Sequence, residues 1–281
     1  MSGTKRIFGV FLILLLAVAL VAAGCGGGKA QEEPQKPSSE PQAKPKLIVA
    51  SDTAYAPFEF LDTKTGEYVG FDMDLIRAIA AEIGYEPEIR SMAFDGVLGA
   101  VASSQTDCAI SAITVTKKRL ENMDFSKAYY QSGLTIVVQE GNNTIKSFKD
   151  LEGKRIAVQA ATTGANKAKE IKGAKITQFD RVTDALLEVK KGSADAVIND
   201  NPVNQYYLAR DLGKGLKIVG DLLSAEDYAI AVPKGKQELL QKINDALMKL
   251  KENGKYNEIY KKWFGVDAPA DLPRDYVAVE G

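Results

Sequence analysis

The sequence predicts an α/β protein whose doubly wound, parallel-rich sheets form two lobes. The main observation is that short apolar segments alternate with amphipathic helical segments along most of the chain. The length of 281 residues is enough for two medium domains. A content of 45% hydrophobic and 26% charged residues is typical of a globular protein with a sizeable core.

The chain begins with the pattern of a secretory signal. Lys5 and Arg6 precede a continuous apolar run over 7–23, which predicts a signal peptide over residues 1–24. The run ends in AAGC at Cys25, which resembles the lipobox of bacterial lipoproteins, although lipoboxes usually carry leucine three residues before the cysteine. The resemblance implies cleavage before Cys25 and attachment of a lipid to its thiol. The alternatives are cleavage without lipidation and a segment that stays in the membrane.

A linker follows the signal. Residues 25–46 are rich in Gly, Pro, Ser, Glu and Gln and show no apolar periodicity, which is the composition of a disordered segment. We therefore expect a lipid-anchored flexible linker that holds the folded body outside the cytoplasm, at the cell surface or in a periplasm.

The first part of the folded body has a β-α-β-α-β pattern. The expected strands cover 47–50, 86–90 and 108–114, and the expected helices cover 71–83 and 94–102. Asp72 is expected to cap the first helix, and an acid–base pair of Asp72 with Asp74 is the alternative. Asp52 and Tyr55 follow the first strand, at a strand end where α/β proteins collect ligands.

The second part continues the alternation. The expected strands cover 134–139, 155–159, 176–179, 194–198, 217–219 and 228–232, and the expected helices cover 165–171, 182–191 and 237–253. Asp200 stands beyond the carboxyl end of strand 194–198. The order of these elements predicts that the second lobe is inserted into the first.

The stretch 106–126 has the pattern of an anion site. Thr116 occupies an N-cap position, and three cations that end in Arg119 fill the first helical turn. Cations there are unfavourable for the helix alone, because its N-terminus favours negative charge. A bound carboxylate would reverse that effect, since Arg119 offers a bidentate fork and Thr114 and Thr116 offer hydroxyl groups. The alternative is a solvated basic start of a helix.

The composition argues against several classes of function. The chain has no histidine, which excludes histidine-based catalysis and histidine-bound metals. Its two cysteines, Cys25 and Cys108, lie far apart, and Cys108 in an apolar strand is expected to be buried. A net charge of −1 does not indicate a basic surface that binds nucleic acid. We therefore expect no metal, no cofactor and no nucleic-acid partner, and the family resemblance given below adds the expectation that the chain is not an enzyme.

Several motifs carry a family resemblance. The stretches SDTAYAPFEF, YVGFDMDL, AISAITVTKKR, MDFSKAYYQSG, VQAATTG, ADAVINDNP and NGKYNEIYKKWFG occur in order between residues 47 and 266. They resemble the amino-acid-binding branch of the bacterial extracellular solute-binding proteins of ABC importers, especially glutamine-binding and arginine- or lysine-binding members.

The resemblance implies a two-lobe, periplasmic-binding-protein-like fold. Its lobes are joined by two crossing strands, near 129–133 and 224–228, and they close on the ligand. The expected boundaries are 47–131 with 226–268 for the first, large lobe, 132–225 for the second, small lobe, and 269–281 for a C-terminal tail.

The resemblance also implies a ligand site. Arg119 would bind the α-carboxylate, with help from Thr114, Thr162 and Thr163. Asp200 and the backbone oxygen of Ala112 would accept hydrogen bonds from the α-ammonium group. Tyr55 and Phe94 would form aromatic walls, and Asp52 would face the far end of the ligand side chain. Gln159 stands where glutamine binders commonly carry lysine.

These residues predict a binding protein for a polar or basic L-amino acid, which it delivers as a monomer to the membrane permease of an ABC transporter. Asp52 is the one ionised group expected at the far end of the pocket, where Gln159 and Asn199 are neutral, so arginine is expected to bind better than lysine or glutamine. The alternatives are a glutamine-specific binding protein, a dehydratase-type enzyme on the same fold, and the sensor domain of a receptor.

Overall fold

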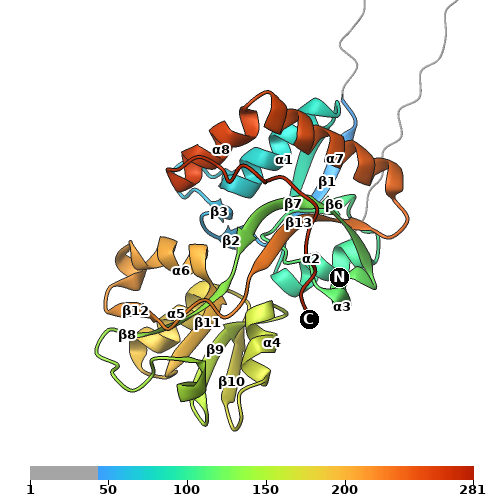
Figure 1. Ribbon diagram of the computed structural model, residues 1–281. Helices are drawn as coiled ribbons and strands as arrows, with labels where there is room; N and C mark the ends of the chain where they lie inside the picture. The colour runs from blue at the N-terminus through green and yellow to red at the C-terminus, as the bar shows by residue number, and fades with distance from the viewer. Residues whose placement is uncertain (1–43) are drawn as a thin grey trace, which may run out of the picture. The chain divides into compact units, whose positions relative to one another are not determined.

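The computed structural model describes residues 44–281. The predicted signal peptide, Cys25 and nearly all of the predicted linker lie outside these described residues. Two five-stranded sheets and one three-stranded sheet carry helices on their faces, which confirms the predicted two-lobe α/β fold (Figure 1). Among the described helices, none combines the length and the apolar character that a bilayer crossing requires.

The first lobe is built on a sheet with the order β5-β1-β6-β13-β7. Its strands are β1 (Lys46–Ser51), β5 (Glu86–Ser91), β6 (Cys108–Ala109), β7 (Met123–Ser132) and β13 (Glu226–Pro233). Its helices are α1 (Phe71–Glu82), α2 (Phe94–Ala102), α3 (Lys117–Leu120), α7 (Gln237–Glu252) and α8 (Lys255–Phe264). Strand β1 is parallel to β5 and β6, whereas β13 is antiparallel to β6 and β7, so the sheet is mixed.

The second lobe is built on a sheet with the order β10-β9-β11-β8-β12. Its strands are β8 (Leu134–Gln139), β9 (Arg155–Gln159), β10 (Lys175–Phe179), β11 (Ala196–Asp200) and β12 (Leu216–Val219). Its helices are α4 (Thr163–Lys169), α5 (Val182–Lys191) and α6 (Asn201–Leu208), with 3-10 turns η1 (Phe148–Leu151) and η2 (Asp211–Gly213). Strand β9 is parallel to β10 and β11, and β8 is antiparallel to β11 and β12.

Two connections link the lobes. Strand β7 of the first sheet leads directly into β8 of the second, and the chain returns from β12 to β13. Strands β7 and β13 are paired in antiparallel register from Met123 with Pro233 to Ser132 with Glu226. Figure 1 shows the two strands running side by side toward the second sheet. The two crossing strands are confirmed, and the lobe boundaries that the sequence gives stay predictions.

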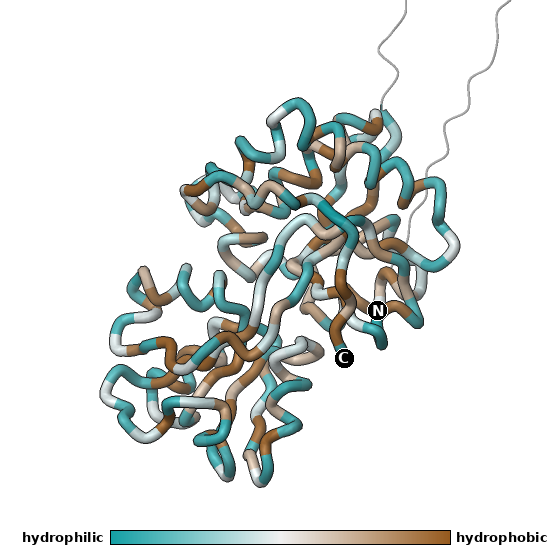
Figure 2. Tube along the Cα trace, viewed as in Figure 1, coloured by the Kyte–Doolittle hydropathy of each residue, from teal (hydrophilic) through white to brown (hydrophobic). Residues whose placement is uncertain are grey.

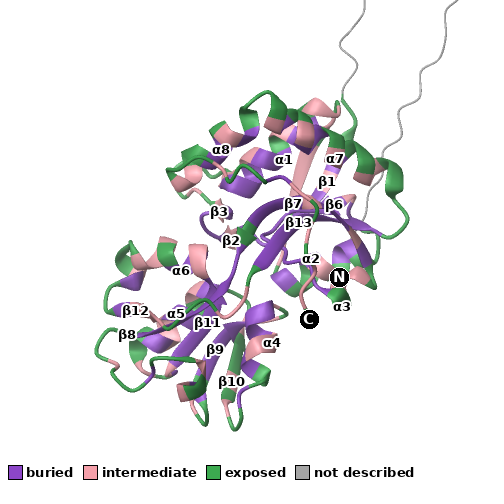
Figure 3. Cartoon of the chain, viewed as in Figure 1, coloured by how far each residue is buried: buried purple, intermediate pink, exposed green. Residues whose placement is uncertain are grey.

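The central strands of both lobes are buried, as strands in α/β sheets must be when helices cover both faces, whereas the edge strands β5 and β10 are partly exposed. Every residue of β13 and β11 is buried, and in β8 only Gln139 is exposed. Figure 3 shows these strands in the colour of buried residues, and Figure 2 shows that hydrophobic residues are concentrated in the strand segments. Cys108 is fully buried with a free thiol, as predicted.

Aromatic rings pack under the crossing strands of the first lobe. The ring centroids of Phe58 and Tyr130 are 5.0 Å apart, and those of Tyr130 and Phe264 are 4.9 Å apart. Tyr228 of β13 stacks on Tyr130 at 5.7 Å. Such pairs add about 0.5–1.5 kcal/mol each beyond their buried area, so this cluster gives the crossing strands a firm base.

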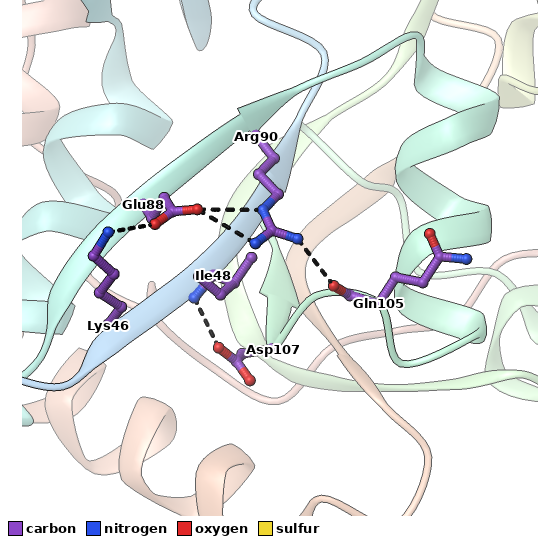
Figure 4. A network of polar contacts seen from close by, with 6 residues as sticks. All are labelled: Lys46, Ile48, Glu88, Arg90, Gln105 and Asp107. Carbon is purple, nitrogen blue, oxygen red and sulfur yellow. Dashed lines mark hydrogen bonds and ion pairs between the residues drawn. The ribbon is translucent and has the colours of Figure 1, made fainter. Parts of the chain in front are cut away.

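A polar network holds the outer strands of the first sheet in place (Figure 4). Glu88 of β5 binds Lys46 Nζ at 2.8 Å and also contacts Arg90, whose guanidinium lies 3.5 Å from the Gln105 carbonyl oxygen. Asp107 Oδ2 accepts a hydrogen bond from the Ile48 N–H at 2.7 Å. The network therefore fixes the loop that leads into β6.

Two expectations need correction, and several elements were not predicted. Strand β6 covers only two residues, not 108–114, because Ala112 has a left-handed φ of 46° that a strand cannot contain. Asp72 does not cap α1, which Gly70 precedes, and its side chain is fully buried. Helix α6 and a small sheet were not predicted. The sheet consists of β2 (Ala54–Tyr55), β3 (Glu59–Leu61) and β4 (Tyr68–Val69).

The C-terminal tail is an ordered strap along the first lobe. The Val279 N–H donates to Val115 O at 3.1 Å, and the Lys117 N–H donates to Val279 O at 2.9 Å. Arg274 pairs with the buried carboxylate of Asp227 in β13 at 2.7 Å. The strap therefore supports both the start of α3 and a crossing strand.

Candidate functional site

One cavity gathers the residues that the sequence singles out. The space between its lining atoms, including the part that opens to solvent, is about 270 Å³. All ten predicted site residues line it, together with Ser111, which the sequence reasoning missed. The first lobe contributes Asp52, Tyr55, Phe94, Ser111, Ala112, Thr114 and Arg119, and the second contributes Gln159, Thr162, Thr163 and Asp200.

Arg119 supplies a positive charge to this cavity. It lies in the short helix α3, which Thr116 caps as predicted by accepting the Arg119 N–H at 3.1 Å. Its guanidinium donates to Thr114 O at 2.7 Å and to Ala161 O at 3.1 Å, and it lies 5.2 Å from the ring centroid of Phe94. Burial lowers the pKa of Arg119 to about 10, so the side chain stays charged at neutral pH. Its other N–H groups remain available for an anion.

A buried glutamate that the sequence reasoning missed stands behind the threonines. Glu226 of β13 accepts hydrogen bonds from Thr114 Oγ1 at 2.7 Å and Thr163 Oγ1 at 2.8 Å, one from each lobe. Ser224 Oγ donates to its other oxygen at 2.8 Å. The two threonine hydroxyls that were expected to contact a ligand therefore donate to Glu226, while Thr162 caps α4 by accepting the Ala165 N–H.

Asp200 supplies a negative charge on the opposite side. It is the last residue of β11, which extends two residues beyond the strand expected over 194–198, and one of its oxygens accepts a hydrogen bond from the Tyr55 hydroxyl. Its other oxygen, Oδ1, is buried and has no hydrogen-bond partner among the described residues. Burial and the charge of Glu226 raise the pKa of Asp200 to about 7. A buried carboxylate oxygen of this kind requires a donor, and a cation satisfies it best.

Asp52 lies at the other end of the cavity. Its Oδ2 accepts a hydrogen bond from Gln159 Nε2 at 2.7 Å, and its backbone N–H donates to Ser111 Oγ at 3.0 Å. Burial raises the pKa of Asp52 to about 6, while the Gln159 hydrogen bond and the charge of Arg181 act in the opposite direction. Asp52 is therefore ionised at pH 7.

Two expectations about this end of the cavity are wrong. Asp52 is not the only ionised group there, because the exposed side chains of Arg181 and Asp180 share with it the lining of an outer groove. Asn199 does not line the inner cavity, because its amide is bound to Asn204 and its Oδ1 lies 2.8 Å from the Tyr55 hydroxyl. The opposite charges of Arg181 and Asp180 offset each other, so Asp52 still gives this end a negative charge.

The cavity thus presents three charged groups in a fixed arrangement. Arg119 can hold a carboxylate and Asp200 can hold an ammonium group. When both groups belong to one carbon atom of a ligand, Asp52 can contact the side chain of that ligand. Among the described residues, no group of three or more potential metal ligands comes together. This arrangement suits a small zwitterion with a polar or cationic extension.

The fold and the cavity define a two-lobe solute-binding protein. A sequence model of the bacterial extracellular solute-binding proteins, family 3, matches residues 47–266, and the chain belongs to this family. This finding confirms the resemblance that the sequence motifs carry.

Relatives with sequence similarity over almost the whole chain are amino-acid binders by name. The ABC transporter glutamine-binding protein GlnH of Bacillus subtilis is 32% identical over 95% of this chain and 100% of its own length. The arginine-binding extracellular protein ArtP of the same organism is 33% identical over 90% of this chain and 97% of its own.

Similar solved structures are also of amino-acid-binding proteins. An ancestral arginine-binding protein, with solved structures bound to arginine and bound to glutamine, is 42% identical with a TM-score of 0.76, over 79% of this chain and 99% of its own. An ancestral amino-acid-binding protein described as a precursor of cyclohexadienyl dehydratase is 38% identical with a TM-score of 0.72, over 78% of this chain and 95% of its own.

Proposed function

We propose that this chain binds one polar or basic L-α-amino acid in the cavity between its lobes. The observation that carries the proposal is the pairing of charged Arg119 with Asp200, whose Oδ1 is buried without a partner among the described residues. An α-amino acid presents a carboxylate and an ammonium group on one carbon atom. It therefore matches both groups at once.

The α-carboxylate would bind the free N–H groups of Arg119, since charge-assisted bidentate pairs are the strongest anion contacts available to a side chain. The α-ammonium group would donate to Asp200 Oδ1 and to the backbone oxygen of Ala112. Residues from both lobes form this receptor. Because a dry cavity strengthens each polar contact, closure of the lobes around the ligand would increase affinity.

The ligand side chain would extend toward Asp52. A guanidinium or ammonium group would pair with this carboxylate, whereas glutamine would offer a hydrogen bond only and leave the Asp52 charge without a counterion inside the cleft. We therefore rank arginine above lysine and glutamine. The names of the relatives include both glutamine and arginine binders, so the names alone do not rank these ligands.

The chain would deliver its ligand, as a monomer, to the membrane permease of an ABC transporter. The family and the name of the glutamine-binding relative support this role. The signal-like segment and the lipobox-like tetrapeptide at Cys25 support an anchored lipoprotein outside the cytoplasm. Incorporation of labelled palmitate, compared with a Cys25→Ser variant, would test the anchor.

A thermal-shift panel tests the proposed function. After co-purified ligand is removed by unfolding and refolding, each of the common L-amino acids is added and the melting temperature is measured. A ligand at 100 times its Kd adds about 2.7 kcal/mol to the free energy of unfolding, so a true ligand is readily detected. Arginine should give the largest shift, and a panel without any shift would refute amino-acid binding.

A second candidate is a dehydratase-type enzyme. The observation in its favour is the likeness to the ancestral precursor of cyclohexadienyl dehydratase. Mass spectrometry after incubation with prephenate-like acids would detect a dehydrated product. Turnover of such an acid would establish the enzyme and replace the proposal of a binding protein.

A further inference from the structure

A sharp turn at Ser111 and Ala112 forms one wall of the cavity. Ala112 has a φ of 46°, a left-handed conformation that is unfavourable for a non-glycine residue. Two buried acids hold this turn. Glu59 Oε1 accepts the Ser111 hydroxyl at 2.7 Å, and Asp72 Oδ2 accepts the Ala112 N–H at 2.8 Å.

These two acids are fully buried, they bind neighbouring residues of the turn, and each shifts the pKa of the other. Both have 0% of their surface exposed. Glu59 Oε2 and Asp72 Oδ1 have no hydrogen-bond donor among the described residues. Two adjacent buried carboxylates cannot both be ionised without a large cost, and a single proton placed between them would satisfy both oxygens.

The surroundings indicate which acid carries that proton. Asp72 Oδ2 has two donors, the Ala112 N–H and the Tyr129 hydroxyl at 2.9 Å, which stabilise its ionised form. Glu59 has only Ser111 as a donor. Burial raises the pKa of both acids, and the charge of Asp72 raises the pKa of Glu59 further, whereas that of Asp72 reaches only about 7.

The pair also acts on both ends of the proposed ligand site. Ser111 Oγ donates to Glu59 and accepts the Asp52 N–H at 3.0 Å, so Glu59 fixes the position of Asp52 through one hydroxyl. Asp72 fixes Ala112, whose backbone oxygen is the proposed acceptor for the α-ammonium group. The other titratable groups whose charges act near the pair are Asp52, Tyr55, Tyr129 and Tyr207.

We propose that Glu59 and Asp72 share one proton and together are positioning residues for amino-acid binding. Protonated Glu59 donates to Asp72 Oδ1, and the pair holds the Ser111–Ala112 turn in its left-handed conformation. The binding part of this inference rests on the proposed function, whereas the shared proton does not.

Three full-length variants test the pair. Glu59→Gln keeps the shape, the acceptor for Ser111 and a donor for Asp72, so it imitates the protonated acid. Glu59→Met keeps the volume and removes both hydrogen bonds. The double variant Glu59→Gln with Asp72→Asn places two amide NH₂ groups where one donor fits. Glu88→Gln, at a surface ion pair, is the control.

We expect Glu59→Gln to keep its arginine affinity. Glu59→Met and the double variant should bind arginine roughly tenfold or more weakly than Glu59→Gln in calorimetry. Infrared spectra in D₂O at pD 8 should show a protonated-carboxyl band in the wild type that is missing from Glu59→Gln and present in Glu88→Gln. If Glu59→Gln loses as much affinity as Glu59→Met, or if its spectrum equals that of the wild type, the inference is wrong.

The infrared comparison separates this inference from the proposed function. A wild type that binds no amino acid would refute the proposed function and the positioning role. The carboxyl band, and the melting temperatures of Glu59→Gln and the double variant, would still decide whether the proton is shared. Should Glu59→Met fail to fold, the double variant supplies the affinity comparison.

Discussion

Gln159 Nε2 and Asp52 Oδ2 are 2.7 Å apart, and this hydrogen bond joins a strand end of one lobe to a strand end of the other. Because Gln159 is neutral, it orients Asp52 without cancelling its charge. A cationic ligand group can therefore use the same carboxylate. The pair is the structural basis for our ranking of arginine over glutamine.

Asp52→Asn should weaken arginine binding by roughly tenfold or more while changing glutamine binding little, because only the cation depends on the charge. Calorimetry with both ligands measures this. Asp95→Asn is the matched control, since Asp95 is an exposed carboxylate whose charge also acts on Asp52. Equal losses for both ligands would show that Asp52 does not face the ligand side chain.

Gln159→Lys should shift the preference toward glutamine. An ammonium group beside Asp52 would neutralise its charge and repel a guanidinium, so arginine affinity should fall by roughly tenfold or more. The control is Gln178→Lys, the same substitution at an exposed position of β10. Unchanged arginine affinity in Gln159→Lys would contradict the proposed contact with Asp52.

Acid should reduce the selectivity for arginine. Burial raises the pKa of Asp52 from its usual 3.8 to about 6, so the carboxylate becomes neutral as the pH falls through 6. The ratio of the glutamine Kd to the arginine Kd should therefore decrease below pH 6. Both affinities should also fall as the pH drops through 7, because Asp200, with a pKa of about 7, must be ionised to hold the ammonium group.

The stability of the free protein should change in the opposite sense. A buried acid with a raised pKa disfavours its own ionised form, so Asp52 and Asp200 stabilise the fold less as the pH rises through their pKa values.

Calorimetry between pH 5 and 7.5 tests the predicted change in selectivity. If the ratio of the glutamine Kd to the arginine Kd stays constant over this range in the wild type, the role of Asp52 is refuted. In Asp52→Asn the ratio should be constant.

Arg119→Ala should abolish most amino-acid binding without unfolding the protein. The lost charge pair inside a dry cavity is worth about 2–5 kcal/mol, so calorimetry should show a large fall in affinity for arginine and glutamine alike. Lys118→Ala, an exposed neighbour in α3, should bind normally. If Arg119→Ala keeps its affinity and melting temperature, the α-carboxylate binds elsewhere.

The sequence predicts most of the fold because apolar periodicity survives in buried strands and amphipathic helices. The strand predicted over 108–114 is longer than β6, because nothing in the residue type of Ala112 indicates its left-handed φ. The sequence assigns Asp72 to a cap because the aspartate lies at a helix start, whereas only the folded structure shows the partner Glu59 beneath the turn. Such tertiary pairings leave no local pattern.

The sequence motifs identified most of the residues that line the cavity. They missed three groups, two of which lie near these residues only because of how the chain folds. Ser111 adjoins Ala112 in the chain and could have been included from that neighbourhood. Glu226 lies in a crossing strand and reaches the site only because β13 pairs with β7. Arg181 follows β10 and approaches Asp52 only when the lobes face each other.

We propose that Arg119 and Asp200 form the two halves of one α-amino-acid receptor, and the other predictions depend on this claim. Calorimetric titration of the wild type and of Arg119→Ala with L-arginine and with agmatine, which lacks only the α-carboxylate, tests it most directly. The wild type should bind L-arginine far more tightly than agmatine, and Arg119→Ala should lose this difference because it no longer senses the carboxylate. A wild type that binds agmatine as tightly as L-arginine, or an Arg119→Ala variant that still discriminates between them, would contradict the claim.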